Sequence, residues 1–256
     1  MRRITLILRE EIDPHLPIEA ESIGPETLSK RIDVPVYVGN EQKMLKDVFY
    51  IRVDGEAAGP SATEIVLVGD FHQVKRVGEY MTDGKIIVEG GIGMHCGDFM
   101  SGGTIEIMGD ADHWLGREML GGKIICHGNA GNYCGSGYRG GRKGVRGGEI
   151  LVEGNVGDYC AECLFGGLVL VKGSAGIHAG CNMKGGKLLI EGDCLMPCGD
   201  MFDGLATIYG HVTDFLPTFV ETGQEIEKDH RLTVFKGDMA HRNPKGILRV
   251  GSYDRI

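Results

Sequence analysis

Apolar and polar residues alternate in short segments that recur along the chain at a nearly constant distance. Seven segments of seven residues begin and end with glycine, from GKIIVEG at 84–90 to GLATIYG at 204–210. The five between them are GTIEIMG at 103–109, GKIICHG at 122–128, GEILVEG at 148–154, GLVLVKG at 167–173 and GKLLIEG at 186–192. An imperfect eighth copy, TEIVLVG, occupies 63–69. The closing glycines are 21, 19, 19, 26, 19, 19 and 18 residues apart, so a repeat of about 19 residues carries one insertion of seven.

Each complete copy is typical of one short strand with a single buried face. Its third and fifth residues are apolar, as in Ile86 and Val88, whereas the residues between them are more polar or variable. This period of two predicts a half-buried strand, and the flanking glycines suit tight turns. A second column of small or apolar residues stands six positions after each closing glycine: Cys96, Leu115, Cys134, Cys160, Ala179 and Cys198.

A repeat of this length predicts an all-β solenoid. Nineteen residues are too few for a helix pair or a propeller blade, but they match one coil of a parallel β-solenoid. We expect about seven or eight coils over residues 61–210, which at about 4.8 Å per coil make a core roughly 35 Å long. Residues 1–60 lack the repeat and are expected to form an N-terminal cap, with strands in ITLILRE and VFYIRV. Residues 211–256, with strands in LTVFKG and GILRVG, are expected to form a C-terminal cap or arm.

Composition narrows the class of protein. The 256 residues include 43 glycines and carry a formal net charge of −9, which argues against nucleic acid or an anionic membrane as the main partner. No apolar run approaches the length of a membrane helix, and the N-terminal segment has no small-residue cleavage site. We therefore expect a cytoplasmic protein whose eight cysteines are reduced.

Two motifs resemble cofactor or metal sites. Gly135, Gly137 and Gly140 spell G-x-G-x-x-G, but the preceding strand ends too early and GRKGVRGG cannot form the helix that a dinucleotide fold needs. Cys160 and Cys163 form one C-x-x-C pair, as in zinc or iron–sulfur sites. The repeat accounts for five cysteines as small buried residues: Cys96, Cys126, Cys134, Cys160 and Cys198. The repeat leaves Cys163, Cys181 and Cys194 unexplained, so a stand-alone metal- or anion-binding protein stays an alternative.

A column of rings, here called the aromatic column, lies five positions after the closing glycines. Its members are His95, Trp114, Tyr133, Tyr159 and His178. If this part of the coil is extended, the column faces outward. Its rings can then either stack on one another or anchor a partner protein. Neither histidine has an acid or nucleophile partner that the sequence reveals. The acidic residues Asp98, Glu118 and Glu162 in the same turns are expected on a solvated face.

The insertion of seven residues carries an unusual cluster of positive charge. Its basic loop, defined by Arg139, Arg142, Lys143 and Arg146, breaks a regular repeat in an acidic chain. Ordering such a loop costs conformational entropy. We therefore expect the basic loop to contact an acidic surface of a partner.

The repeat, as in GGTIEIMGDADHWLGREMLGGKIICHGNAGNYCG, resembles the G-x-G-x-G repeat family. This family includes the C subunit of formylmethanofuran dehydrogenases, the corresponding subunit of a bacterial formyltransferase/hydrolase complex, and the C-terminal region of the large glutamate synthase chain. The resemblance covers about residues 60–215. It is strongest to the dehydrogenase C subunit, because the chain is short and its turns are rich in cysteine.

The resemblance implies a right-handed parallel β-helix and a non-catalytic scaffold role. The implied complex reduces CO2 and fixes it onto methanofuran, the first step of methanogenesis from CO2. The implied partners are an amidohydrolase-like A subunit, pterin-binding B and D subunits, and ferredoxin-like subunits. A molybdenum or tungsten pterin, a binuclear metal site and iron–sulfur clusters belong to those partners, and no cofactor or catalytic residue is expected in this chain. The alternative within the family is a glutamate synthase subunit that links amidotransferase and synthase parts.

Overall fold

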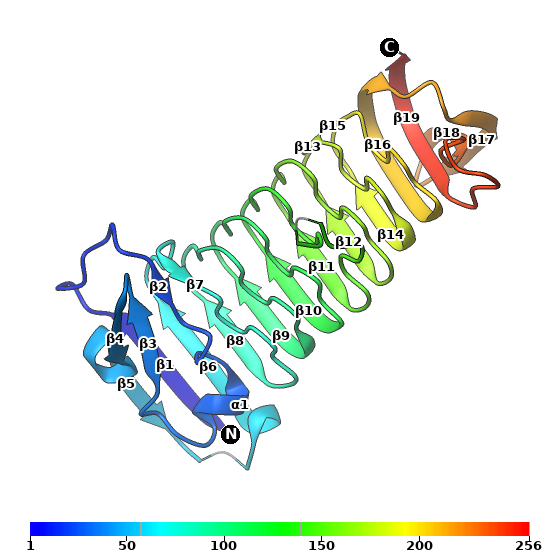
Figure 1. The fold of residues 1–256 in the computed structure, drawn as a ribbon. Coiled ribbons are helices and arrows are strands. Elements are labelled where there is room, and N and C mark those ends of the chain that lie inside the picture. The colour runs from blue at the N-terminus through cyan, green and yellow to red at the C-terminus, as the bar shows by residue number, and fades with distance from the viewer. Residues whose placement is uncertain (57, 139, 256) are drawn as a thin grey trace.

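The computed structural model describes residues 1–56, 58–138 and 140–255 as an elongated stack of strands. Figure 1 shows strands side by side along its length, with the two termini at opposite ends. The fold is mostly β, and its larger sheet holds 15 strands of the described chain, most of them paired in parallel. The central strands are β6 (Thr63–Val68), β8 (Lys85–Val88), β9 (Ser101–Ile107), β10 (Gly121–Cys126), β11 (Glu149–Val152), β12 (Leu168–Val171), β14 (Lys184–Ile190), β16 (Asp203–Phe215) and β19 (Ile247–Arg255).

The register of these strands follows the sequence repeat. Each repeat forms one layer, and β8 pairs with β9 so that Ile86 lies opposite Ile105, 19 positions further on. Ile124 of β10 lies opposite Ile150 of β11, so the layer of 26 residues is brought back into register. Both predicted inward positions of the strands are buried, and Ile86, Ile105, Ile124 and Ile150 are all 0% exposed. The predicted strands and their buried face are confirmed.

A second row of parallel bridges follows the strands on another side of the stack. It joins Phe71, Ile92, Ala111, Ala130, Val156 and Ala175. In the last layers the row becomes two strands, β13 (Ala175–Ile177) and β15 (Cys194–Leu195), with Ala175 opposite Cys194. Cys194 is 3% exposed and therefore occupies an inward position. One of the three cysteines that the repeat left unexplained is thus a core residue.

The third side of each layer is a turn and not an extended segment. The residues of the aromatic column all have φ between 58° and 67°, in the left-handed region that side chains rarely adopt. This part of the layer is therefore not extended, and the five side chains are half-buried. Backbone amides two residues apart in the turn donate hydrogen bonds to the layers on opposite sides. Gly116 N–H donates to Cys96 O of the layer before at 2.8 Å, and Trp114 N–H donates to Asn132 O of the layer after at 2.9 Å. The turn takes this form because it links each layer to the layers on both sides.

Side chains at one corner bond in a row that follows the stack. Asp110 Oδ1 accepts the Asn129 N–H at 2.7 Å, and Asn129 Oδ1 accepts the Asn155 N–H at 2.9 Å. Asn155 Oδ1 in turn accepts the Ser174 N–H at 2.8 Å. Each bond satisfies a backbone donor that the turn leaves free, as in a helix cap. The row holds the corners of successive layers in register.

The two ends of the stack are closed by segments without the repeat. At the N-terminal end, β1 (Arg2–Leu8) pairs in parallel with β6 and antiparallel with β5 (Phe49–Asp54). A smaller sheet covers that end and contains β2 (Ile18–Glu19), β3 (Pro35–Val38), β4 (Glu41–Met44) and β7 (Val74–Lys75). Among the described residues, three short helical segments accompany it: α1 (Pro25–Leu28), α2 (Leu45–Val48) and η1 (Pro60–Ala62). No helix in the described ranges is long and apolar enough to span a membrane.

At the C-terminal end, the main sheet continues past the repeats. β19 pairs in parallel with β16, and the hairpin of β17 (Val220–Glu227) and β18 (His230–Lys236) extends the sheet antiparallel to β19. Phe215, Phe235 and Tyr253 form a ring cluster over the last layer, with Phe215 and Phe235 centroids 4.6 Å apart. The predicted strands in LTVFKG and GILRVG are confirmed, whereas β17 was not predicted.

Alanine substitutions at two glycines distinguish the energetic cost of the left-handed turn conformation from the cost of close packing. Gly116 has φ +64°, and a Cβ there would lie 2.5 Å from Ile150 Cδ1. Gly140 has φ +81° with nothing within 4 Å of the same position. We expect Gly116→Ala to lower the free energy of unfolding by about 2–4 kcal/mol and Gly140→Ala by about 1 kcal/mol. Urea unfolding measures both, and equal losses would contradict the packing argument.

Candidate functional site

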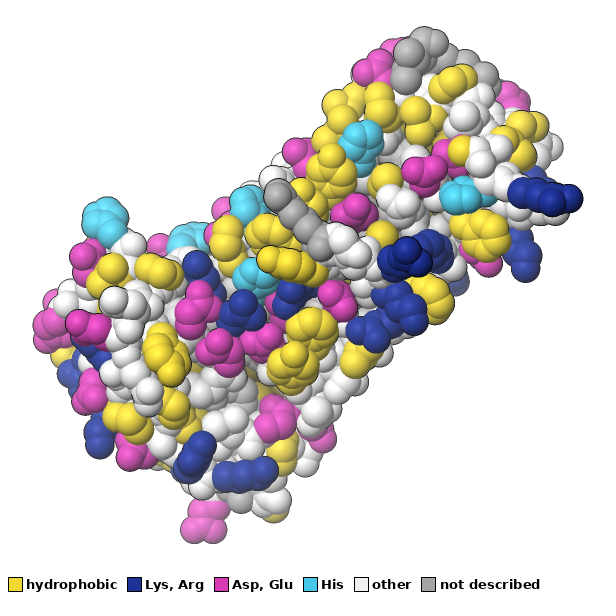
Figure 2. Space-filling model, viewed as in Figure 1, with side chains coloured by type: hydrophobic (Ala, Val, Ile, Leu, Met, Phe, Trp, Pro, Cys, Tyr) yellow, Lys and Arg dark blue, Asp and Glu magenta, His cyan; other side chains and the backbone are white. Residues whose placement is uncertain are grey.

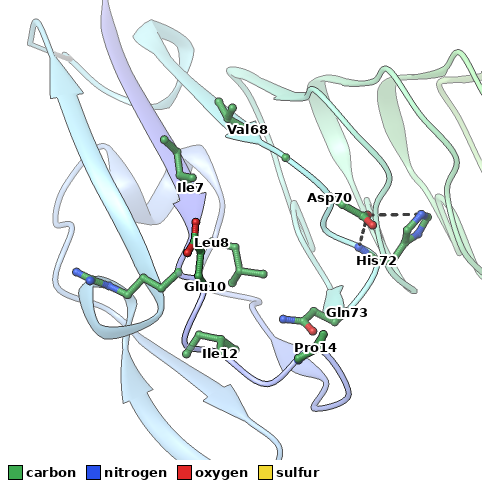
Figure 3. A pocket seen from close by; sticks show the side chains of 11 residues that line it. Ile7, Leu8, Glu10, Ile12, Pro14, Val68, Asp70, His72 and Gln73 are labelled. Carbon is green, nitrogen blue, oxygen red and sulfur yellow. Dashed lines mark hydrogen bonds and ion pairs between the residues drawn. The ribbon is translucent and has the colours of Figure 1, made fainter.

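A pocket that opens at the N-terminal end lacks the groups of an active site. It has a volume of about 490 Å³ and is lined by apolar residues of β1 and the loop after it, among them Ile7, Leu8 and Ile12 (Figure 3). Its lining also includes the polar residues Arg9, Glu10 and Gln73, and an ion pair of Asp70 and His72 with Oδ1 and Nε2 3.5 Å apart. Their side chains are 72% and 55% exposed, so water screens the pair. The pocket therefore offers an apolar recess without a shielded acid or base.

A serine, a histidine and an aspartate meet on the C-terminal part of the sheet. His211 Nδ1 lies 2.9 Å from Ser252 Oγ, and His211 Nε2 lies 3.1 Å from Asp254 Oδ2. A catalytic triad needs a buried acid that orients the histidine, but the Asp254 side chain is 76% exposed. His211 and Ser252 are register partners of β16 and β19. The set is best explained as a cross-strand contact on an exposed sheet.

The cysteines do not form a metal centre in the described part of the chain. No group of three or more His, Cys, Asp or Glu residues is placed there to share an ion. Seven of the eight thiols are buried, and Cys181 is half-buried. Burial raises the pKa of Cys126 to about 12 and that of Cys181 to about 11, so both stay protonated at neutral pH. Protonated thiols are weak nucleophiles and weak metal ligands.

The aromatic column forms a continuous stack along the turns. Neighbouring ring centroids are 5.0–5.3 Å apart from His95 to His178. The first three pairs are parallel to within 9°, and Tyr159 and His178 are tilted by 44°. All five residues are half-buried. The predicted mutual stacking is confirmed, and the column keeps only its ring edges for contact with a partner.

A buried ion pair lies beside this stack. Asp98 is fully buried, and its Oδ2 accepts hydrogen bonds from Arg117 Nε at 2.8 Å and Nη2 at 2.7 Å. His95 Nδ1 lies 2.9 Å from the same oxygen. Burial raises the pKa of the Asp98 carboxyl, while His95 and Arg117 act in the opposite direction. The expectation that this acid lies on a solvated face is wrong, because the turn folds it under the rings.

Arg117 also belongs to a second stack that reaches the insertion. Tyr80 and Phe99 stack with centroids 5.0 Å apart, and the Arg117 guanidinium carbon lies 4.7 Å from the Phe99 centroid. On its other side the guanidinium lies 5.2 Å from the ring of Tyr138, which belongs to the insertion. Tyr138 N–H also donates to Glu118 at 3.4 Å. The buried ion pair thus provides a platform that anchors the start of the insertion.

The basic loop follows Tyr138 on the surface. Arg142 and Lys143 are exposed, and Lys143 Nζ lies 5.0 Å from the Phe165 ring centroid. Arg146 Nη2 lies 3.7 Å from Glu118 Oε2, so an acid of this chain already compensates part of its charge. Arg139 lies outside the described residues. The contact of this loop with a partner stays a prediction.

Charges on the outer face of the sheet contrast with the basic loop, because they neutralise one another. His127 lies between Glu153, at 2.9 Å, and Glu106, at 3.3 Å. Lys85 and Lys172 complete the row, at 3.0 Å from Glu106 and 2.7 Å from Glu153. Hydrogen bonds to the two acids raise the pKa of His127. This row is a set of internal ion pairs on the sheet face.

Sequence reasoning assigned Asp98 to a solvated face and missed Arg117, although a signal for their pairing was present. The two residues are 19 positions apart and occupy the same place in successive repeats. Opposite charges at the repeat distance lie one above the other in such a stack, as oppositely charged residues do across neighbouring strands. Tyr138 carried no comparable signal, because the insertion has no counterpart in other layers.

Removing one member of the buried pair should cost more than removing both. Asp98→Ala leaves the buried Arg117 guanidinium without its acid, and we expect the free energy of unfolding in urea to fall by about 3–5 kcal/mol. The double variant Asp98→Ala, Arg117→Met removes both charges and should recover most of that loss. Equal losses in the two variants would mean that lost packing, and not the unpaired charge, is responsible.

No family model matches the chain. It is 38% identical over 98 residues to the C subunit of the tungsten-containing formylmethanofuran dehydrogenase 2 of Methanothermobacter wolfeii, a match that covers 36% of each chain. It is 35% identical over 102 residues to the C subunit of the molybdenum-containing formylmethanofuran dehydrogenase 1 of Methanosarcina barkeri, covering 37% of this chain and 32% of that relative. The matched part of the chain thus spans about a third of the length of these curated relatives.

A solved structure is similar over nearly the whole chain. It is a chain in the crystal structure of the formyltransferase/hydrolase complex of Methylorubrum extorquens with methylofuran. The TM-score is 0.84 and the identity 28%, and the match covers 96% of this chain and 98% of that chain. The resemblance to the C subunit of formylmethanofuran dehydrogenases, predicted from the repeat, is confirmed.

Proposed function

We propose that this chain is a non-catalytic scaffold subunit of a formylmethanofuran dehydrogenase complex, which it serves by bridging catalytic subunits. The observation that carries the proposal is the match over 96% of the chain, with a TM-score of 0.84, to a chain of a multisubunit complex. Curated relatives, named as C subunits of such dehydrogenases, point to the same assembly at 35–38% identity.

The stacked layers support a finer assignment of the fold, a right-handed parallel β-helix. Successive strands pair in parallel, and each is reached by a crossover connection of one repeat. Crossovers between parallel strands of one sheet are right-handed in nearly all proteins. A closed coil of this kind presents long, rigid and regular faces, which suit a scaffold that holds several partners at fixed distances.

The proposal assigns the chemistry to other chains. The partners would be an amidohydrolase-like A subunit, pterin-binding B and D subunits, and ferredoxin-like subunits, in the cytoplasm. They would carry the molybdenum or tungsten pterin, the binuclear metal site and the iron–sulfur clusters. The protonated, buried thiol of Cys126 fits a structural role better than a cluster-binding role.

Purification of the complex from its native host tests the assignment. We expect a tagged chain to co-purify with a pterin enzyme and an amidohydrolase-like protein, identified by mass spectrometry. The isolated chain should reduce no CO2, transfer no formyl group and contain no stoichiometric metal. Co-purification of glutamate synthase pieces, or one metal per chain that is lost on changing Cys160 and Cys163, would overturn the proposal.

Charge reversal tests the basic loop as a docking element. We expect reversal of Arg139, Arg142, Lys143 and Arg146 to weaken assembly at moderate salt by about tenfold or more, because like charges then face an acidic partner. A matched control reverses four exposed cations far from the loop: Lys30, Arg31, Arg231 and Lys236. Size-exclusion chromatography and co-purification yield measure assembly. Unchanged assembly in the loop variant, or equal losses in both variants, would rule out this contact.

A further inference from the structure

One edge of the stack carries a column in which apolar and basic residues alternate. Five members lie one to three residues before a strand of the main sheet, and Lys184 is the first residue of β14. In chain order the members are Leu120, Arg146, Phe165, Lys184, Phe202 and Lys245. The same position in the earlier layers holds Thr82 and Ser101. The alternation, here called the edge column, is therefore confined to the C-terminal part of the stack.

Backbone hydrogen bonds fix the spacing of the edge column. The N–H of Arg146 donates to Met119 O at 2.8 Å, and that of Phe165 donates to Val145 O at 2.9 Å. Leu120, Lys184 and Phe202 donate to the corresponding residue of the layer before, and Lys245 donates to Phe202 O, one position further along the chain, all at 2.7–2.9 Å. Neighbouring members therefore lie about 4.8 Å apart, and members of one kind about 9.6 Å apart.

The edge column is exposed, and much of its charge is unpaired. Leu120, Phe165 and Phe202 are 44%, 45% and 38% exposed. Lys184 and Lys245 are exposed and have no ion pair within the described ranges, whereas the charge of Arg146 is partly compensated by Glu118. Figure 2 shows dark blue side chains gathered beside yellow ones between the middle of the molecule and its C-terminal end.

The charge of the edge column selects the kind of partner. The whole chain carries a net charge of −9, yet the edge column contains three cations and no acid. Lys143 of the basic loop adds a fourth cation, with Nζ 5.0 Å from the Phe165 ring centroid. A complementary surface must present acidic groups about every 9.6 Å, with apolar groups between them.

An α-helix meets this spacing better than a strand does. One face of a helix repeats every 5.4 Å per turn, and a helix inclined by about 27° to the stack projects that turn onto about 4.8 Å. Alternate turns then face basic and apolar members of the edge column. Residues on one face of a β-strand are about 6.7 Å apart and lose the register within two layers.

We infer that the edge column binds an amphipathic α-helix of a partner protein in the complex, in which acidic and apolar residues alternate from turn to turn on one face. This inference rests on the proposed scaffold function and names the element that the scaffold would receive. About five turns of helix cover the six members. Phe165 and the lysines beside it form the centre of the contact, as anchors in interfaces commonly do.

A synthetic peptide tests the contact on the isolated chain. The probe is a helical peptide of about five turns in which glutamate and leucine alternate on one face. A peptide of the same composition, with the three glutamates in adjacent turns, is its control. We expect fluorescence anisotropy to show saturable binding of the probe, and about tenfold weaker binding of the control.

Variants assign the binding to the edge column. Lys184→Glu with Lys245→Glu, and separately Phe165→Ser, should each weaken binding of the probe by about tenfold or more. The control double variant Lys30→Glu with Arg31→Glu should bind as the unchanged protein does. Circular dichroism checks that each variant is folded. Equal binding of the two peptides, or no effect of the edge-column variants, would overturn the inference.

Crosslinking in the assembled complex separates this inference from the proposed function. A photoreactive amino acid at position 165 should crosslink to a helical, acidic segment of a co-purifying protein. If the complex purifies intact but position 165 crosslinks to no such segment, the inference that the edge column binds a helix is wrong, whereas the scaffold proposal is unaffected. If no expected partner co-purifies and the peptide still binds in the predicted manner, the proposed function is wrong, whereas helix binding by the edge column is supported.

Discussion

Backbone hydrogen bonds between layers set the rise of the stack, and every other feature depends on that distance. A rise of about 4.8 Å leaves no room for a Cβ at Gly121, where it would lie 2.4 Å from the backbone oxygen of Ser101 in the layer before, which explains the dense use of glycine in the turns. The same distance brings aromatic rings to 5.0–5.3 Å, where parallel stacking is favourable. It also places the Arg117 guanidinium against the Phe99 ring and the Asn129 side-chain amide against the Asn155 backbone amide. Side chains at equivalent positions therefore interact as columns along the axis.

This constraint explains what could be predicted from the sequence. The strands, their buried residues such as Ile124 and Ile150, and the register across the insertion follow from a pattern that seven copies repeat. The left-handed turns could not be predicted, because residues such as Trp114 rarely adopt positive φ and only their bonds to both neighbours require it. Asp98 was misassigned to the solvent because its partner is distant in sequence. The strand β17 is polar throughout most of its length and forms because it pairs with β18.

One part of the candidate interaction surface could be predicted from the sequence, and another part could not. The position and charge of the basic loop follow from the insertion, which one irregular spacing in the sequence reveals. Its anchoring does not, because Tyr138 reaches Arg117 only once the chain is folded. The pairing of charges also separates surfaces that composition cannot distinguish. The ions around His127 neutralise one another, whereas Lys184 and Lys245 have no such partners within the described ranges.

The regular rise gives the chain the properties of a graduated ruler. Each repeat adds about 4.8 Å between the two caps and leaves the local contacts of the other layers unchanged. Gain or loss of one 19-residue unit would therefore move the surfaces at the two ends relative to each other in a fixed, small step. The insertion shows the complementary freedom, since extra residues leave the stack sideways and do not alter its length. Distance along the axis and decoration of the surface can thus evolve independently.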